Sequence, residues 1–322
     1  MLPTMKERIT VRRPSALAAV LLAASLGLVA CGSGSEDGDE TASTESGITV
    51  SGEFGDKPEL GIPEGDPSDE LVVEVLSEGD GAEVEAGDFL LAHYLGQTWE
   101  EAEGGEVNVF DNSYDREAPA GFTIGTSAVI PGWDEGLVGK KVGSRVLLSI
   151  PPDKGYADSP PEGSTIEAGA TLVFVVDMVD TFGADAGISG APVTDLPADV
   201  PTVTGDGADE PTVGFPAAAT PVETSSADVL VEGDGEELGE TLVVKVVQAS
   251  YNTKETQFSS WAEDGPGPIT ITADQLPGLS EALAGKKVGT RALVRISAAD
   301  NVTEEAPNGE PIAIVVDIIG AF

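Results

Sequence analysis

The sequence contains very few of the residues from which disulfide frameworks, metal centres and histidine-based active sites are built. Its 322 residues include one cysteine and one histidine. A lone cysteine excludes disulfides within the chain, so stability has to come from packed cores. One histidine and one cysteine cannot supply the ligands of a zinc cluster. We therefore predict no metal and no cofactor, and we expect His93, which lies in a strand-like run, to be structural.

Basic residues are also scarce. The chain has 16 lysines and arginines against 57 aspartates and glutamates, which gives a net charge of −41 at pH 7. A surface of this sign repels phosphate backbones, so the composition argues against nucleic acid as a partner. For the same reason, residence at an anionic membrane would require a covalent anchor.

Long hydrophobic runs are absent apart from one near the N-terminus. Ala16–Val29 is an uncharged, largely apolar run but only 14 residues long, which is too short to span a hydrocarbon core of about 30 Å. Basic residues precede it and "LVAC" closes it at Cys31, an order typical of an export signal. The ending resembles a bacterial lipobox. We expect residues 1–30 to be a lipoprotein signal peptide and Cys31 to carry a lipid that anchors the protein at the extracytoplasmic face of the cell membrane; an ordinary secretory signal is the alternative.

The rest of the chain contains an internal duplication. "EVLSEGDG" and "GKKVGSRVLLSI" in the first half return as "DVLVEGDG" and "GKKVGTRALVRI" in the second. Small polar, acidic or Gly/Ala/Pro-rich segments precede and separate the copies, and such compositions are typical of linkers. The predicted organisation is a flexible acidic tether (31–46), a first domain (47–183), a linker (184–199) and a second domain (200–322).

Within each copy, most segments have the two-residue period of β-strands. "DFLLAHYLG" and "TLVFVVDMV" are examples, and Gly-Asp or Pro-Gly turns separate such runs. The exception is a short helix with Pro131 in its first turn and Gly139 at its end. Trp133 and Leu137 would lie on one face of that helix and point toward the strands. We predict an α+β fold in which each copy is a curved antiparallel sheet around one short helix.

Five motifs of the first copy occur in an order that resembles a known family. They are "HYLG", "FDNSYDR", "VIPGWDEGL", "VGSRVLLSIPPDKGY" and "ATLVFVV". Over Leu71–Phe182 the chain is similar to the FKBP-type peptidyl-prolyl cis-trans isomerases. The resemblance implies two tandem FKBP-like domains, the first with an aromatic pocket for a proline ring. It also implies an isomerase that acts on X-Pro bonds of exported proteins and assists their folding, with proline-containing polypeptides as partners and macrolide inhibitors as further ligands.

The resemblance also assigns roles to individual residues. Trp133 would form the pocket floor, Asp111 would lie near the imide carbonyl, and the N–H of Ile130 and the hydroxyl of Tyr156 would hold substrate carbonyls. The substrate-binding residues around these four would be Tyr94, Phe110, Arg116, Phe122, Val129, Ile166 and Phe174. Three departures from the family pattern bear on macrolide affinity and substrate preference: Ala120 stands where a phenylalanine is common, the connection from Tyr94 to Phe110 is longer than in compact members, and "ADSPPEGSTIEAG" lacks the usual His-Pro-Gly.

The second copy keeps the glycines and strand residues but loses the residues of this pocket. No counterpart of Tyr156 survives. Our alignment replaces Trp133 with Leu279, Tyr94 with Val247 and Asp111 with Ser259. We expect residues 200–322 to fold without isomerase activity.

Two other functions remain compatible with the sequence. In one, both domains grip extended polypeptides as a non-catalytic chaperone or scaffold lipoprotein. In the other, the chain is a solute-binding or adhesive lipoprotein with isomerase ancestry. The isomerase remains the first choice, because the motifs that carry the pocket are all present.

Overall fold

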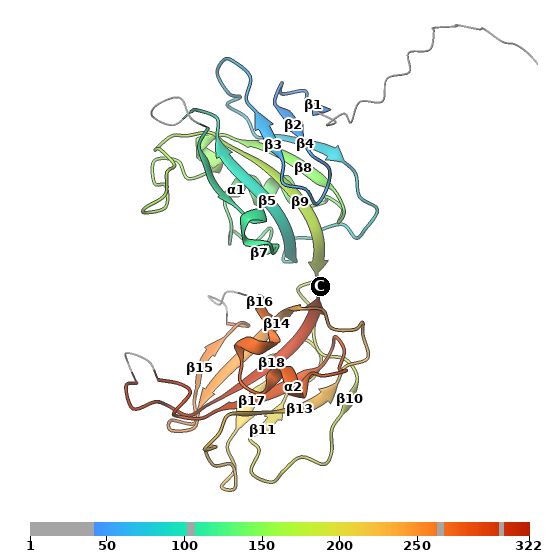
Figure 1. Ribbon diagram of the computed structural model, residues 1–322, viewed down its shortest axis with the longest axis vertical. Coiled ribbons are helices and arrows are strands. Elements are labelled where there is room, and N and C mark those ends of the chain that lie inside the picture. The colour runs from blue at the N-terminus through green and yellow to red at the C-terminus, as the bar shows by residue number, and fades with distance from the viewer. Residues whose placement is uncertain (1–41, 102–106, 263–266, 303–305) are drawn as a thin grey trace, which may run out of the picture. The chain divides into compact units, whose positions relative to one another are not determined.

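Strands dominate the protein and its helices are short (Figure 1). The structure, a computed structural model, describes residues 42–101, 107–262, 267–302 and 306–322. Every strand pairing in these residues is antiparallel. The helices are α1 (Pro131–Leu137), α2 (Leu279–Ala282) and the 3-10 helices η1 (Tyr114–Arg116), η2 (Pro152–Lys154) and η3 (Ala273–Gln275).

The first sheet contains the strands of the first copy. Its order is β4 (Val72–Ser77), β8 (Arg145–Ile150), β9 (Leu172–Phe182), β5 (Phe89–Thr98) and β6 (Val109–Asn112), and β7 (Ala120–Thr123) also pairs with β5. Residues of β8 alternate between its two faces: Val146 and Leu148 pack with Trp133 and Leu137 of α1, whereas Leu147 packs on the opposite face. The sheet is therefore buried on both sides, which explains why its central strands are mostly apolar.

The helix α1 lies close to β8 because two of its residues have no side chain. Pro131 is its first residue, where the missing N–H is not needed for a helical hydrogen bond. A Cβ on Gly132 would come within 2.6 Å of Ile150, and one on Gly136 would come within 2.6 Å of Leu148. These glycines let the backbone of the helix approach the strand and lower Trp133 toward the sheet.

A β-hairpin covers the outer face of the first sheet. It consists of β2 (Thr49–Ser51) and β3 (Glu59–Gly61), and β1 (Ala42–Ser43) pairs with β2. Ile48, Val50 and Leu60 pack against residues of β8 and β9. Complete burial of one such side chain contributes about 1.5–3 kcal/mol. The hairpin therefore completes a second core on the face opposite α1.

The second sheet repeats the strand order of the first. It runs β10 (Ala191–Pro192), β13 (Ser226–Glu232), β17 (Arg291–Ile296), β18 (Ile312–Ala321), β14 (Thr241–Ser250) and β15 (Thr256–Ser259), and β16 (Ile269–Thr272) also pairs with β14. A hairpin of β11 (Thr202–Thr204) and β12 (Thr212–Gly214) contributes Val203 and Val213 to a core on one face. Leu279 of α2 and Leu283, which follows the helix, belong to the core on the other face.

One buried ion pair occurs at the same place in both sheets. Arg145 lies opposite Asp177 across β8 and β9, and Arg291 lies opposite Asp317 across β17 and β18. In each pair the arginine side chain is 3% exposed, the aspartate is fully buried, and the guanidinium makes two hydrogen bonds to the carboxylate. Each arginine also donates to a backbone carbonyl before the second strand of the adjoining hairpin, that of Gly52 or Gly205. The pair therefore joins each hairpin to its sheet.

Both segments predicted as tether and linker are structured in part. Residues 42–43 of the predicted tether form β1, and the N–H groups of Glu45 and Ser46 donate to the Glu74 carboxylate at 2.6 and 2.9 Å. Residues 191–192 of the predicted linker pair with β13. Composition alone missed these contacts because each depends on a partner strand outside the segment itself. Residues 1–41, with the predicted signal peptide and Cys31, lie outside the described residues.

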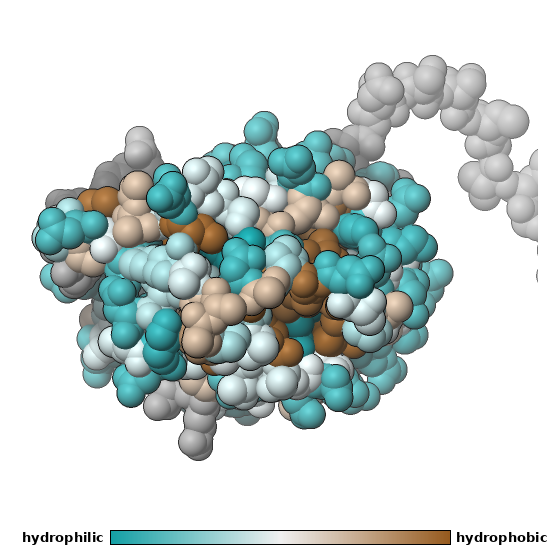
Figure 2. All heavy atoms as spheres, turned by 90° about the horizontal axis from the view of Figure 1, so that it is seen from below, coloured by the Kyte–Doolittle hydropathy of each residue, from teal (hydrophilic) through white to brown (hydrophobic). Residues whose placement is uncertain are grey.

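Charged and apolar residues separate between surface and interior. Figure 2 shows one face, on which hydrophilic side chains line the rim and apolar ones gather in patches nearer the centre. None of the helices in the described ranges has the length and apolar character needed to cross a membrane.

Candidate active site

A cavity of about 730 Å³ opens between α1, the first sheet and the loop after η2. All the pocket residues proposed from the sequence line it, except Arg116. Four further residues line it as well. The complete lining is Tyr94, Phe110, Asp111, Phe122, Ala128, Val129, Ile130, Pro131, Trp133, Tyr156, Pro161, Ser164, Ile166 and Phe174.

The floor of the cavity is a cluster of aromatic rings around Trp133. Its indole is 3% exposed and meets three rings edge to face, those of Tyr94, Phe122 and Phe174, with centroids 5.6, 4.8 and 5.3 Å away. This perpendicular arrangement is favourable for aromatic quadrupoles and holds each ring in one orientation. The floor is therefore rigid and apolar.

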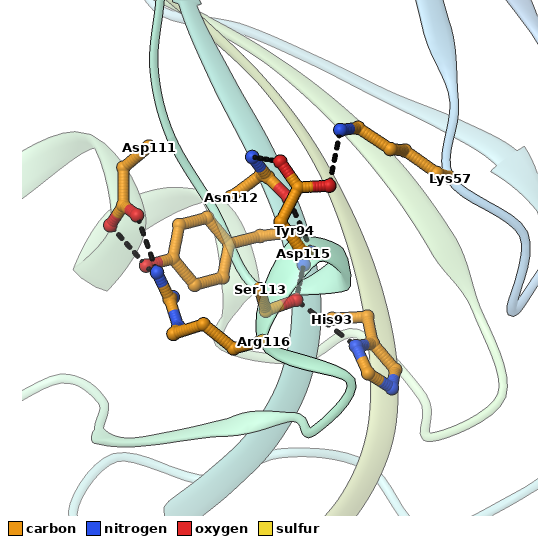
Figure 3. A network of polar contacts seen from close by, with 8 residues as sticks. All are labelled: Lys57, His93, Tyr94, Asp111, Asn112, Ser113, Asp115 and Arg116. Atoms are coloured by element: carbon orange, nitrogen blue, oxygen red, sulfur yellow. Dashed lines mark hydrogen bonds and ion pairs between the residues drawn. The ribbon is translucent and has the colours of Figure 1, made fainter.

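A polar cluster of Tyr94, Asp111 and Arg116 reaches the floor (Figure 3). The Tyr94 hydroxyl donates to Asp111 Oδ2, and Arg116 donates to Asp111 Oδ1 at 2.7 Å and to the Tyr94 oxygen at 2.8 Å. Tyr94 comes from β5, Asp111 from β6 and Arg116 from η1, so three separate elements converge on one carboxylate.

This cluster keeps Asp111 ionised. Partial burial pushes the pKa of its carboxyl upward, but the hydrogen bonds from Tyr94 and Arg116 and the charge of Arg116 outweigh that effect and hold the pKa below its ordinary value. Burial and the neighbouring carboxylate raise the pKa of Tyr94 to about 12, so its hydroxyl keeps its proton. A fixed carboxylate therefore stands beside the apolar floor at neutral pH.

The backbone N–H of Ile130 and the hydroxyl of Tyr156 are among the cavity's hydrogen-bonding groups that are free to bind a ligand. Within the described ranges, neither the backbone N–H of Ile130 nor the hydroxyl of Tyr156 hydrogen-bonds to another residue. Ile130 has an extended backbone (φ −62°, ψ 145°), the conformation that a following proline favours. The Ile130–Pro131 sequence thus keeps this N–H outside the hydrogen bonding of α1.

Two of the departures noted in the sequence, the long connection before β6 and the loop after η2, contact each other. Asn108, at the end of the long connection before β6, donates from Nδ2 to the carbonyl of Thr165 at 2.9 Å. The Thr165 hydroxyl in turn donates to Asn108 Oδ1 at 2.8 Å. This double contact joins the connection to the loop that carries Ile166 and places Pro161 and Ser164 in the wall. No sequence motif identifies it, because its partners lie 57 residues apart.

His93 does not line the cavity. Its ring stacks on Tyr114 at 5.0 Å, and Nδ1 hydrogen-bonds to the Ser113 hydroxyl at 3.0 Å. Burial lowers its pKa. The residue thus contacts the sheet and η1 rather than the cavity. Among the described residues there is no group of histidine, cysteine and acidic side chains placed to hold a metal ion.

Strand register corrects one of the sequence alignments between the copies. Tyr94 lies opposite Val176, one residue before the aspartate of the buried ion pair. In the second sheet Val246 lies opposite Val316, again one residue before the aspartate of the pair. Val246, and not Val247, therefore takes the place of Tyr94. The alignment was one residue out, and in a strand this moves a side chain to the other face of the sheet.

The aspartate position needs the same correction. Ser113 and Ser260 accept the N–H of Tyr94 and of its counterpart in β14, at 2.9 and 2.8 Å. Asp111 and Phe258 stand two residues before these serines, so Phe258 replaces the aspartate, and the proposed Ser259 was wrong. The Phe258 side chain is 40% exposed. Leu279 does occupy the place of the tryptophan and is completely buried.

Comparisons with known proteins agree with this geometry. The sequence profile described as "FKBP-type peptidyl-prolyl cis-trans isomerase" matches residues 81–179. An FK506-binding protein of Streptomyces anulatus is 40% identical over 124 residues, 38% of this chain and 96% of the relative. A probable FK506-binding protein of Corynebacterium glutamicum is 38% identical over 125 residues, 38% of this chain and 98% of the relative. The crystal structure of FkpA from Escherichia coli is 36% identical and covers 35% of this chain and 49% of that chain, with a TM-score of 0.30. The chain therefore belongs to the FKBP-type peptidyl-prolyl cis-trans isomerase family.

Proposed function

We propose that the 730 Å³ cavity is the isomerase active site and that the chain works on exported proteins with one catalytic domain, residues 47–183. The observation that carries the proposal is the ionised Asp111 beside the Trp133 floor, with the free N–H of Ile130 at the edge. Residues 200–322 would be a second FKBP-like domain without a catalytic pocket. The repeated strand order and the repeated buried ion pair support this common origin.

The reaction needs neither a nucleophile nor a metal. Rotation about a prolyl bond faces a barrier of about 18–20 kcal/mol because amide resonance must be broken, and the uncatalysed step takes tens to hundreds of seconds. In the twisted transition state the carbonyl oxygen loses part of its negative charge. Any surrounding that disfavours the planar, more polar amide therefore accelerates rotation. A reduction of the barrier by about 4 kcal/mol gives roughly a thousandfold acceleration.

Each feature of the cavity fits this requirement. The aromatic floor would enclose the proline ring and exclude water from the imide. The Asp111 carboxylate would repel the partial negative charge on the imide oxygen, which is larger in the planar state. The N–H of Ile130 and the hydroxyl of Tyr156 would hold the flanking carbonyls while the bond rotates. Burial, and then the charge of Asp111, raise the pKa of Tyr156, so its hydroxyl stays a donor.

Asp111→Val should lower kcat/KM on a short X-Pro peptide at least about tenfold, a loss of about 1.4 kcal/mol of transition-state binding. A protease-coupled assay of the purified chain measures the rate. The matched control is Phe258→Val, at the equivalent position of the second sheet, which should leave the rate unchanged. If Asp111→Val binds and isomerises the peptide as the unchanged chain does, another site catalyses the reaction. If the unchanged chain binds the peptide without accelerating rotation, the chaperone or scaffold alternative holds.

We also propose that a lipid on Cys31 anchors the protein outside the cytoplasmic membrane, where it assists the folding of exported proteins. The support is the sequence alone: the basic segment, the short apolar run and the "LVAC" ending. Because two relatives are named for binding FK506, we extend the proposed ligands of the pocket to macrolides of that class.

Cys31→Ala should move the protein from the membrane fraction to the soluble extracytoplasmic fraction or the medium. The reason is that a lipidated cysteine would be the sole anchor of a strongly acidic body. Fractionation followed by immunoblotting measures the distribution. A variant that still sediments with membranes after a salt wash would mean that a different feature holds it there.

A further inference from the structure

The N-terminal segment, which precedes the region matched by the family profile, contacts η1, the helix that carries Arg116 of the active-site cluster. The family profile begins at residue 81, whereas the turn of the β2–β3 hairpin spans residues 52–58. The buried Arg145–Asp177 pair holds this turn: Arg145 donates to the carbonyls of Gly52 and Asp56, and the N–H of Gly55 donates to Asp177 at 2.6 Å. The turn is thus joined to the centre of the sheet.

The same turn and ion pair also hold η1. The Tyr114 hydroxyl donates to Asp177 Oδ2 at 3.0 Å, and Lys57 in the turn pairs with Asp115 at 2.6 Å (Figure 3). The third residue of η1, Arg116, reaches the other way and bonds to Asp111. Two of the three side chains of one short helix are therefore held by the N-terminal segment and its ion pair, and the third orients the carboxylate of the pocket.

From this arrangement we infer that the 52–58 turn is a positioning element of the active site, which places Arg116, and through it the Asp111 carboxylate, by way of Lys57 and Tyr114. The inference rests on the proposed role of Asp111. Arg116 alone could swing on a flexible stem, but a helix whose first two residues are fixed limits where its guanidinium can reach.

A comparison with the second sheet separates the contacts that both sheets share from the contact that the sheet with the pocket makes. There the equivalent turn is also held: Arg291 donates to the Gly205 carbonyl and Trp261 Nε1 donates to the Ala208 carbonyl at 2.8 Å. However, Ala262 follows Trp261, and alanine cannot form the ion pair that Asp115 forms with Lys57. Both sheets therefore hold their turn in place through the buried arginine. The ion pair between the turn and η1, Lys57 with Asp115, belongs to the first sheet, which has the pocket.

The test combines Lys57→Ala with Tyr114→Phe, because an exposed ion pair alone contributes little and the phenyl ring keeps the stacking on His93. The carboxyl ¹³C signal of Asp111, followed by NMR against pH, reports the position of Arg116, since loss of that contact lets the Asp111 pKa rise toward its ordinary value. We expect this rise in the double variant, together with a fall in kcat/KM of about threefold or more. Glu74→Gln is the control: it weakens the contacts of Glu45 and Ser46 without touching η1, and it should change neither quantity.

A folded double variant with an unchanged Asp111 pKa would overturn the inference. A rise of the Asp111 pKa in Glu74→Gln as large as that in the double variant would overturn it as well. Should the double variant fail to fold, Tyr114→Phe alone decides in the same way, because it removes the hydrogen bond to the buried Asp177 and keeps the ring. A pKa that rises without any fall in rate would support the positioning role and count against the catalytic role of Asp111. The two proposals can therefore fail separately.

Discussion

Replacing Trp133 with leucine is expected to lower kcat/KM for an X-Pro peptide at least about tenfold while the chain stays folded. Leucine is the residue that the second sheet has at this place, buried under the same kind of helix, so the fold tolerates it. It cannot reproduce the flat indole against which Tyr94, Phe122 and Phe174 are packed. A proline ring would then contact a smaller, uneven floor that admits water. The free energy by which the cavity favours the twisted amide over the planar amide would therefore decrease.

The control for this result lies at the equivalent position of the second sheet. Leu279→Ala removes a completely buried side chain and should reduce the free energy of unfolding by about 2–5 kcal/mol. Its kcat/KM should nevertheless equal that of the unchanged chain, because catalysis is proposed for the first sheet alone. Trp133→Leu with a wild-type rate, or Leu279→Ala with a tenfold lower rate at a temperature where it is folded, would contradict the assignment of the site.

Arg145→Met should give the largest loss of stability, about 3–5 kcal/mol in the free energy of unfolding. The substitution leaves Asp177 buried and charged, and the carbonyls of Gly52 and Asp56 lose their donor. Removal of one member of a buried pair is costly because the other charge cannot regain water. Urea denaturation followed by circular dichroism measures the change, and Arg291→Met should behave alike in the second sheet.

Two further variants separate this effect from a general effect of charge. Lys141→Met breaks an exposed pair with Glu78 and should change stability little, since water and salt screen such pairs. Arg145→Met combined with Asp177→Leu leaves no unpaired charge, so its loss should be smaller than the sum of the two single losses. A full additive loss would show that the guanidinium stabilises the fold through packing rather than through its charge.

Local features of the sequence were enough for the elements around the site. Apolar runs of strand length, bounded by turn residues, marked β5, β8 and β9. Burial does not alternate along them as the expected two-residue period implies, because both faces of the sheet are covered and most of their residues are buried. Pro131 and Gly139 marked the start and end of α1, because proline fixes its own φ and glycine accepts the left-handed φ of +78° found at Gly139. The resemblance carried by the order of motifs then named most of the residues that line the cavity.

The tertiary structure alone decided which residues of the two copies correspond. A sequence alignment has no means of detecting a slip of one residue when the loops differ in length, yet such a slip reverses the face of a strand. The pairing of Val246 with Val316 and the anchoring of β14 by Ser260 settled the register. They placed Phe258, rather than Ser259, where the first sheet has its aspartate.

The sequence by itself thus determined the strands around the site and the short helix, because each depends on neighbours within a few positions; the pocket residues followed from the resemblance of the ordered motifs to a known family. Only the tertiary structure brought together groups that are distant along the chain. The hairpin at residues 48–62 is too short and too rich in glycine, proline and acids to show a period, and its role depends on Arg145 and Asp177, about 90 and 120 residues further on. The contact of Asn108 with Thr165 and the convergence on Asp111 arise in the same way. Such contacts are set by strand register and loop closure, which no local pattern of residues encodes.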